Sequence, residues 1–218
     1  MSTKHSGSRP ASVRQLQKAE TRAALMNAAR TLFDARGWTA VQVSDLAQAA
    51  GVAHGTVYVH FPGGKAEVMD LLLDGFNRDL VASLQVVWTP AALADPMALG
   101  RAVAATCIDA WAAQRGLVLA AAERAGADGS IAALRDGINP PVAAFLAERL
   151  TLLANVSGVV LPEAEAVAHA LLGLWTRIAL RHLAGGLSRD AAIDVLARMS
   201  IGALSAWFPF LQAPRGES

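Results

Sequence analysis

The sequence has few charged residues and a single cysteine. Asp, Glu, Lys and Arg account for 17% of its 218 residues, whereas an ordinary globular protein is about 25% charged. The single cysteine, Cys107, excludes a disulfide framework within the chain. We therefore expect a reducing, cytoplasmic environment, in which Cys107 behaves as a small hydrophobic residue.

Long apolar runs of the kind that cross a membrane are also missing, although the mean hydropathy is +0.36. A spanning helix needs about 20 consecutive, mainly apolar residues. Three uncharged stretches, 46–64, 80–94 and 199–214, are interrupted by Gly, Ser, Gln or Pro. Residues 1–8 lack the apolar segment of a secretory signal. The composition therefore predicts a soluble protein that buries its apolar surface in a helical core and a subunit interface, with no membrane partner.

Signatures of common catalytic and cofactor sites do not occur in the sequence. There is no Gly-x-Ser-x-Gly elbow, no phosphate-binding loop and no dinucleotide fingerprint. His54 and His60 are six residues apart, and His169 and His182 are thirteen apart, so neither pair shares a helix face. We therefore expect no metal site, no cofactor and no enzymatic activity.

Positive charge is concentrated in the first 65 residues. They contain eight basic and three acidic residues, a net charge of +5, whereas the whole chain has a net charge of +1. A basic segment on a mildly acidic body indicates a polyanionic partner for that segment, although a merely solvated tail would have the same charge. Residues 1–13 are polar and are expected to form a disordered basic tail.

The remaining sequence has helical periodicity and no alternation typical of strands. Leu25, Ala29 and Phe33 recur on one helix face. Gly37 suits the end of that helix, and Ser188 suits the start of the last one. Further helices are expected at 43–50, 54–60, 65–88, 96–115, 117–126, 130–153 (with a kink or break at 139–141), 162–184 and 189–208. The predicted fold is all-α with about nine helices, divided into a three-helix domain at 14–65 and a larger helical domain at 66–212.

Residues 43–61, VSDLAQAAGVAHGTVYVHF, have the pattern of a helix-turn-helix. Ala47 is small enough for a second helix to pack close to the first. Gly51 permits the left-handed backbone that the sharp turn requires, and Val52 fills the angle between the helices. In this motif the N-terminal residues of the second helix enter the major groove of DNA.

The same residues carry a resemblance to a known family. The spacing Asp45-Leu-Ala, Ala50-Gly-Val-x-x-Gly-Thr-x-Tyr-x-His-Phe and Lys65 resembles the tetracycline-repressor-like (TetR) family of transcriptional regulators. The resemblance covers about residues 20–75, and the later helices agree with the family only in number and length. It implies a dimeric, sequence-specific regulator, a repressor released by a small molecule.

The resemblance also implies which residues contact double-stranded operator DNA. Thr56, Tyr58, His60 and Lys65 occupy positions that contact mainly phosphates, which set register, whereas groove contacts set sequence. The full set of expected DNA-binding residues is Gln42, Ser44, His54, Gly55, Thr56, Tyr58, Val59, His60 and Lys65. From the residues alone, Phe61 is expected in the core, while His60 and Ser44 are also compatible with a plain surface role. Arg14 and Lys18 are placed to reach a DNA backbone or minor groove.

This sequence departs from the family pattern at several of these positions. Gln42 stands where the family has a Thr or Ser that caps the second helix, and Gln is a poor cap. Ala53 replaces a common Ser, and Val59 replaces a common Tyr. These departures affect which DNA sequence is recognised, and they leave DNA binding itself as the expectation.

The later helices are expected to supply a homodimer interface. In the family, the last two long helices pair with their copies in a four-helix arrangement, which here assigns the interface to residues 162–184 and 189–208. Small residues that permit close approach occur there: Ala170, Gly173, Ala197, Gly202 and Ala203. The alternative, that these residues belong to the core of a single chain, stays open for each of them.

An effector pocket is expected in the same larger domain. Its candidate lining residues are Cys107, Trp111, Phe145, His169, Trp175 and Arg177, with the histidine or arginine as a polar group. The scarcity of charge favours a lipophilic effector of unknown identity. Two alternatives stay open: a DNA-binding protein without a small effector, controlled by a protein partner or acting structurally on DNA, and a helical carrier or hydrolase that only resembles a DNA-binding protein.

Overall fold

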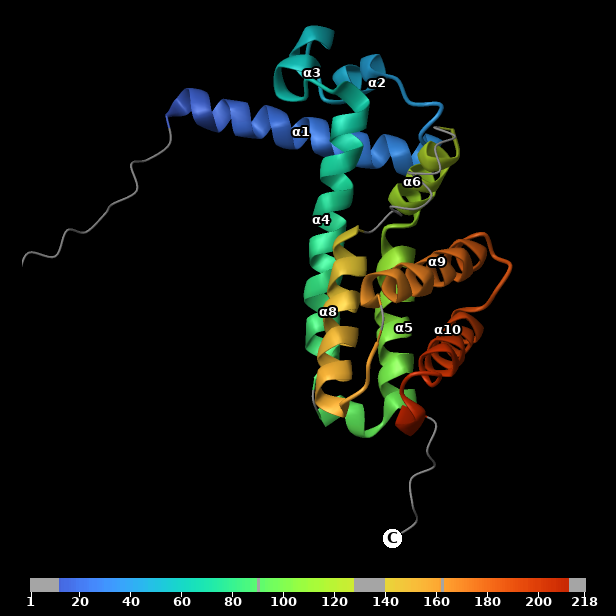
Figure 1. The fold of residues 1–218 in the computed structure, drawn as a ribbon. Helices are drawn as coiled ribbons and strands as arrows, with labels where there is room; N and C mark the ends of the chain where they lie inside the picture. Colours follow the sequence, from blue (N-terminus) through green and yellow to red (C-terminus); the bar gives the residue numbers. More distant parts are fainter. Residues whose placement is uncertain (1–11, 90, 128–139, 162, 212–218) are drawn as a thin grey trace, which may run out of the picture.

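The computed structural model describes residues 12–89, 91–127, 140–161 and 163–211, and within these segments it contains helices and no strand (Figure 1). The α-helices are α1 (Val13–Arg36), α2 (Val43–Ala49), α3 (His54–His60), α4 (Gly64–Val87), α5 (Pro96–Ala113), α6 (Arg115–Ala127), α8 (Pro140–Ser157), α9 (Ala164–Leu183) and α10 (Arg189–Leu204). Two short 3-10 helices lie at Ala91–Ala94 and Pro209–Leu211. The all-α prediction with about nine helices is confirmed for the described part of the chain.

The predicted helix boundaries hold closely where capping residues mark them. Ser12 and Gln15 form a capping box, so α1 begins at Val13, one residue before the expected start. Ser188 accepts a hydrogen bond from the Ala191 amide and caps α10, as predicted. The last helix ends at Leu204 and not near residue 208. The expected tail (1–11) and the first part of the expected 130–153 helix (130–139) lie outside the described residues.

The three N-terminal helices form a small unit at one end of a long helix (Figure 1). We call α1–α3 the N-terminal unit and α5–α10 the body. Helix α4 extends from one into the other and buries Val68, Leu72 and Leu80 along its length. The N-terminal half of α1 projects away from the rest of the molecule, whereas its C-terminal end lies against α6. Among the described residues, no helix is both long enough and apolar enough to span a membrane.

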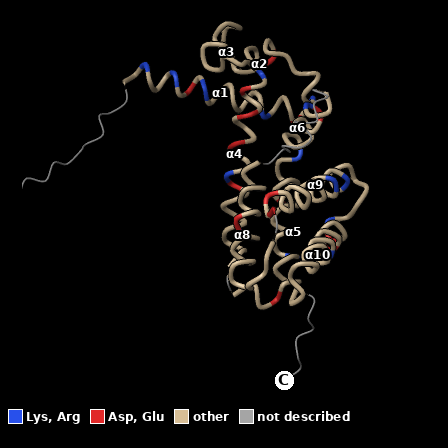
Figure 2. Tube along the Cα trace, in the orientation of Figure 1, with Lys and Arg blue, Asp and Glu red and all other residues tan. Residues whose placement is uncertain are grey.

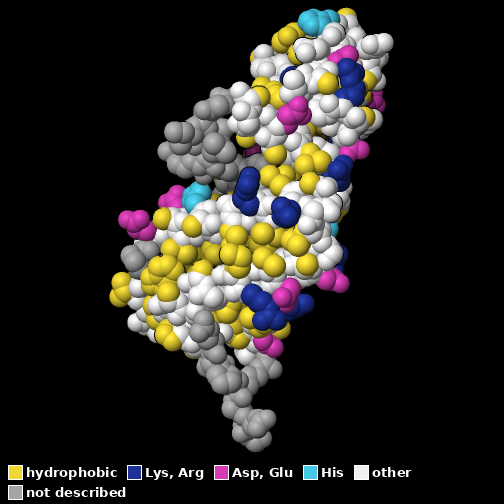
Figure 3. Space-filling model, turned by 90° about the vertical axis from the view of Figure 1, so that its right-hand side faces the viewer, with side chains coloured by type: hydrophobic (Ala, Val, Ile, Leu, Met, Phe, Trp, Pro, Cys, Tyr) yellow, Lys and Arg dark blue, Asp and Glu magenta, His cyan; other side chains and the backbone are white. Residues whose placement is uncertain are grey.

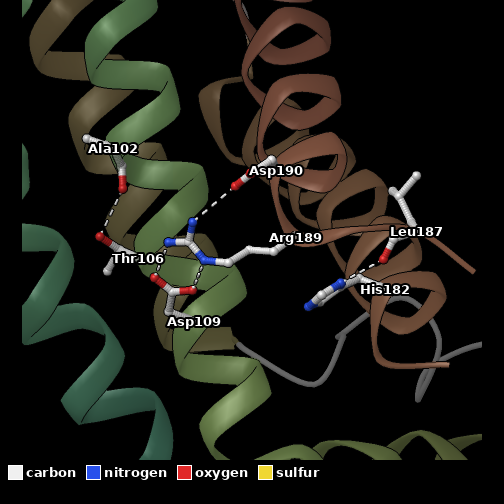
Figure 4. A network of polar contacts seen from close by, with 7 residues as sticks. All are labelled: Ala102, Thr106, Asp109, His182, Leu187, Arg189 and Asp190. Atoms are coloured by element: carbon white, nitrogen blue, oxygen red, sulfur yellow. Dashed lines mark hydrogen bonds and ion pairs between the residues drawn. The ribbon is translucent and has the colours of Figure 1, made fainter. Parts of the chain in front are cut away.

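The body is held together by close helix contacts and by ion pairs at its surface. Helix α10 approaches α5 so closely that a Cβ at Gly100 would lie 3.4 Å from Ile201. At the other end of this contact, Arg189 donates two hydrogen bonds of 2.7 Å to Asp109 (Figure 4). Because this pair is half-exposed, we expect it to contribute little to the stability of the fold.

Candidate nucleic-acid interface

Helices α2 and α3 meet in the geometry predicted for a helix-turn-helix. Gly51 has a φ of 68°, in the left-handed region that favours glycine. The Val52 amide donates a 3.0 Å hydrogen bond to the Ala47 carbonyl and closes the turn. Ala47 itself is buried, as is Val57 of α3. The small side chain and the glycine therefore have the structural roles that the sequence predicted.

The start of α2 is stabilised by a capping-box contact between the N-cap residue Gln42 and Asp45. The Gln42 amide donates a 2.7 Å hydrogen bond to the Asp45 carboxylate, which also pairs with Arg36 at 3.3 Å. The hydrogen bond from Gln42, followed by the charge of Arg36, holds the pKa of Asp45 below its ordinary value. The side chains of Gln42 and Ser44 are exposed.

Helix α3 presents an outer face of uncharged side chains. His54 and Gly55 are exposed, and Val59 is 71% exposed although it is apolar. Tyr58 is 44% exposed, and its ring meets that of His54 edge-on with centroids 5.5 Å apart. Thr56 is half-buried. Six of the expected DNA-binding residues thus lie on this short helix, and five of them are at least partly exposed.

His60 is the expected DNA-binding residue that the structure does not place at the surface. It is only 9% exposed. Arg22 of α1 donates a 2.6 Å hydrogen bond to the His60 carbonyl and lies over the ring of Phe61, 4.3 Å from its centroid. This contact fixes the end of α3 against α1, which turns the histidine inward. Phe61 is fully buried, so its assignment to the core is confirmed.

Lys65 lies in the first turn of the long helix α4, and its ammonium group is hydrogen-bonded to the protein's own backbone. Its Nζ donates hydrogen bonds to the carbonyls of Trp38 (2.9 Å) and Val41 (2.7 Å). It also lies 4.0 Å from the centroid of the Trp38 ring. Sequence analysis missed Trp38; the signal available was a large aromatic residue directly after the glycine that ends α1.

The positive charge near this face comes from α1. Helices α2 and α3 contain no Lys or Arg, whereas basic residues follow one another along α1 (Figure 2). Arg22 and Arg36 are engaged in the contacts described above. Arg14 and Lys18 are exposed on the projecting half of α1. An uncharged face beside a basic, projecting helix is suited to reading base edges while the helix attracts phosphates.

The body contains an apolar cavity of about 60 Å³. Trp175 lines it, and so does Ser200, which accepts a 2.8 Å hydrogen bond from the Trp175 indole. The other lining residues are apolar apart from the backbone of Gly100; they include Trp88, Val103, Leu150 and Ile201.

The remaining residues of the expected pocket lie elsewhere. Cys107 and Trp111 are buried in the core without lining this cavity, and Phe145 lies behind its wall, edge-on to Trp88 at 6.3 Å. His169 lines a separate surface hollow, and Arg177 is exposed. Aromatic side chains on helices are equally suited to core packing, so the sequence pattern alone does not separate the two roles.

One side of the body, formed by α9 and α10, carries small and apolar side chains at its surface. Ala170, Gly173, Gly202 and Ala203 are exposed, whereas Ala197 is buried within the chain. An added Cβ at Gly173 or Gly202 would meet no atom within 4 Å. Figure 3 shows hydrophobic side chains gathered in a band across this side of the molecule. Such a band on a chain with little surface charge is typical of a protein–protein interface.

Comparison with known proteins shows that the N-terminal part of the chain is similar to bacterial transcriptional regulators. The family described as "Bacterial regulatory proteins, tetR family" matches residues 25–72. The repressor KstR2 of Rhodococcus jostii is 43% identical over 63 residues, which are 29% of this chain and 30% of that protein. The regulator TtgR of Pseudomonas putida is 41% identical over 59 residues, 27% of this chain and 28% of that protein. The chain thus matches less than a third of the length of these curated relatives.

Solved structures extend the similarity of fold to nearly the whole chain. A putative TetR-family regulator from Syntrophomonas wolfei has a TM-score of 0.70 at 15% identity, covering 87% of this chain and 97% of that one. Thermus thermophilus FadR, solved in complex with lauroyl-CoA, has a TM-score of 0.62 at 22% identity, covering 90% of this chain and 98% of that one. At these identities the similarity establishes only the fold of the body.

Proposed function

We propose that this chain is a homodimeric, sequence-specific DNA-binding protein of the TetR type, which represses transcription until a small lipophilic effector releases it. The match of residues 25–72 to the tetR family of bacterial regulatory proteins supports this proposal. The observation that carries DNA binding is the outer face of α3 with the basic half of α1 beside it. His54, Gly55 and Val59 would meet base edges, and Thr56 and Tyr58 would contact phosphates. Gln42 and Ser44 of the α2 start are exposed beside them.

Dimerisation would bring two such faces to one operator. Symmetric half-sites lie about 34–36 Å apart, one turn of DNA, and a two-fold dimer matches that symmetry. We assign the interface to α9 and α10, on the surface that carries Ala170, Gly173, Gly202 and Ala203. The open space above the two glycines supports this assignment, because a partner helix could approach there without collision.

The apolar cavity supports a lipophilic effector. A charged group inside it would lose its hydration without gaining a partner, because Ser200 is the single polar side chain in its lining. The T. thermophilus relative was solved with lauroyl-CoA, whose acyl chain has matching chemistry. At about 60 Å³ the cavity must enlarge to hold such a chain. An effector that binds the enlarged body would weaken DNA binding by its preference for that state.

The small size of the cavity also favours a second candidate: a DNA-binding regulator without a small effector, controlled by a protein partner or acting structurally on DNA. Such a protein needs no pocket. One measurement distinguishes the two candidates, namely the operator affinity with and without a bound ligand. A ligand that binds the protein and leaves its operator affinity unchanged would favour the second candidate. The curated relatives KstR2 and TtgR are transcriptional regulators and not enzymes, which argues against a carrier or hydrolase.

The DNA-binding part of the proposal is tested by titrating the purified protein into its own upstream DNA and into a random duplex across a salt series. Binding that contacts about 6–10 phosphates loses roughly 10³–10⁵ in affinity between about 50 and 200 mM salt. A steep salt dependence with a clear preference for the upstream duplex supports a specific regulator. Equal affinity for both duplexes would indicate a structural role, and no binding at low salt would overturn the proposal.

A further inference from the structure

Trp38 occupies the loop between α1 and α2, where groups from three other elements converge. Its ring lies 5.8 Å from that of Phe33 in α1. Two cations lie over the indole: the Lys65 ammonium at 4.0 Å and the Arg124 guanidinium at 5.1 Å from the ring centroid. Arg124 belongs to α6, so the body contributes directly to the surroundings of this loop. We call Trp38, Lys65, Glu123 and Arg124 the Trp38 cluster.

Glu123 of α6 holds the backbone of the same loop. One carboxylate oxygen accepts a 2.7 Å hydrogen bond from the Trp38 amide, and the other accepts a 3.2 Å bond from the Thr39 amide. Hydrogen bonds from Thr39 and then Trp38 lower the pKa of Glu123, so the carboxylate is the form that binds the loop. Gly37, at the end of α1, has a φ of 72°, which favours glycine, and a Cβ there would lie 2.6 Å from Glu123 Oε2.

Lys65 holds the loop from the opposite side. Its two hydrogen bonds go to the carbonyls of Trp38 and Val41, and Val41 lies two residues before α2 begins at Val43. Desolvation lowers the pKa of Lys65 from its ordinary value, which agrees with an ammonium group withdrawn from solvent. Most of its hydrogen-bonding capacity is therefore used inside the protein.

The rest of α6 is tied to α1 and α4 in the same way. Arg124 pairs with Asp70 of α4 at 2.5 Å. At the start of α6, Gly116 lies so close to α1 that an added Cβ would collide with Asp34. The break between α5 and α6 is at Gln114, where the helical backbone is interrupted. Helix α6 is thus anchored to the N-terminal unit at both of its ends.

We propose that Lys65 and Glu123 are positioning residues, which fix the α1–α2 loop around Trp38 and so set the angle at which α2 and α3 face DNA. This inference rests on the proposed function for its DNA-binding readout. It departs from the expectation that Lys65 binds a phosphate. A phosphate would have to compete with the Trp38 and Val41 carbonyls for the same ammonium group.

The salt dependence of operator binding separates the two roles of Lys65. A phosphate-binding lysine contributes about 0.9 to the slope of log K against log salt, whereas a positioning lysine lowers affinity at every salt concentration and leaves the slope unchanged. We expect Lys65→Met to bind the operator about tenfold more weakly, in line with a lost charged hydrogen bond, at an unchanged slope. Lys18→Met, the matched control on the exposed half of α1, should reduce the slope.

Glu123 is tested in the same assay with Glu123→Gln, against Asp74→Asn on the exposed surface of α4 as the control. Because both residues hold one loop, the double variant Lys65→Met/Glu123→Gln should bind within about twofold of the weaker single variant. A slope reduced by about one in Lys65→Met, or unchanged affinity in Glu123→Gln, overturns the proposal. Affinities are compared well below the unfolding temperature of each variant, so that loss of folded protein does not contribute.

A second measurement needs no DNA. In wild-type protein the Trp38 and Thr39 amides donate to Glu123, so both should exchange their hydrogens slowly. Glu123→Gln should accelerate exchange at these two amides and leave the Val52 amide of the helix-turn-helix turn unchanged. Unaltered exchange would overturn the proposed loop contact. If the wild-type protein fails to bind its upstream DNA while the exchange result holds, the proposed function fails and the loop contact stands.

Discussion

The indole N–H of Trp175 donates a 2.8 Å hydrogen bond to the hydroxyl of Ser200 inside a wall of apolar side chains. The bond joins α9 to α10, the two helices that we propose as the dimer interface. Both residues also line the body cavity. Both side chains are almost fully buried. The pair therefore connects the cavity with the two helices that we propose as the dimer interface, and a change at the cavity should be detectable at that interface.

Ser200→Ala is expected to destabilise the fold by about 1–3 kcal/mol, because the buried indole N–H of Trp175 loses its acceptor. Urea denaturation of the wild type and the variant measures the change. The double variant Ser200→Ala/Trp175→Phe removes both polar groups, so it should lose less stability than the two single changes together predict. Strict additivity would show that the hydrogen bond contributes little.

Alanine at Arg14 and Lys18 should weaken DNA binding without changing sequence preference. Both residues are exposed on the projecting half of α1, where they can reach phosphates but carry no information about bases. Each substitution should reduce the salt slope by about 0.9. Binding of operator and random duplexes by fluorescence anisotropy checks this; a loss confined to the operator would contradict it.

Asp45→Asn should destabilise the N-terminal unit at neutral pH and have little effect in acid. The pKa of Asp45 is lowered in the folded state, mainly by the Gln42 amide. Its stabilising contribution is therefore complete above the unfolded-state value of about 3.9 and disappears as the pH falls through the folded-state pKa. Thermal unfolding of both proteins from pH 7 to pH 3 measures the gap, which should close at the acidic end.

Cys107 should be unreactive toward thiol reagents in the native protein. Its side chain is fully buried, and burial raises the pKa of the thiol to about 12, so almost no thiolate exists at neutral pH. Labelling with a chromogenic disulfide should reach completion in denaturant and be negligible without it. Rapid labelling of the folded protein would mean that α5 opens locally.

Gly202→Arg should convert the proposed dimer into a monomer while leaving the chain folded. The site is exposed on α10, and an added side chain meets no atom of its own chain within 4 Å. A long charged side chain would therefore collide only with a partner. Light scattering measures the molar mass and circular dichroism the helix content. Glu148→Arg on α8 is the control, and a Gly202→Arg variant that remains dimeric would move the interface elsewhere.

Local features of the sequence identified the helix-turn-helix. Glycine at position 51, alanine at 47 and the apolar spacing of α1 each act within a few residues, so their consequences can be derived without knowledge of the tertiary fold. The same holds for Ser188, which caps α10 as expected. The pocket residues were harder to assign, because Trp111 and Trp175 have similar patterns and only one of them lines the cavity.

The sequence by itself determined the all-helical fold, the position of the turn at Gly51 and the family of the N-terminal domain, because short-range spacing and backbone freedom decide these features. Tertiary structure alone decided that His60 faces inward and that Lys65 and Glu123 meet at Trp38. Glu123 is separated from Trp38 by 85 positions in the chain. Contacts over such distances depend on how helices pack, and no local pattern encodes them.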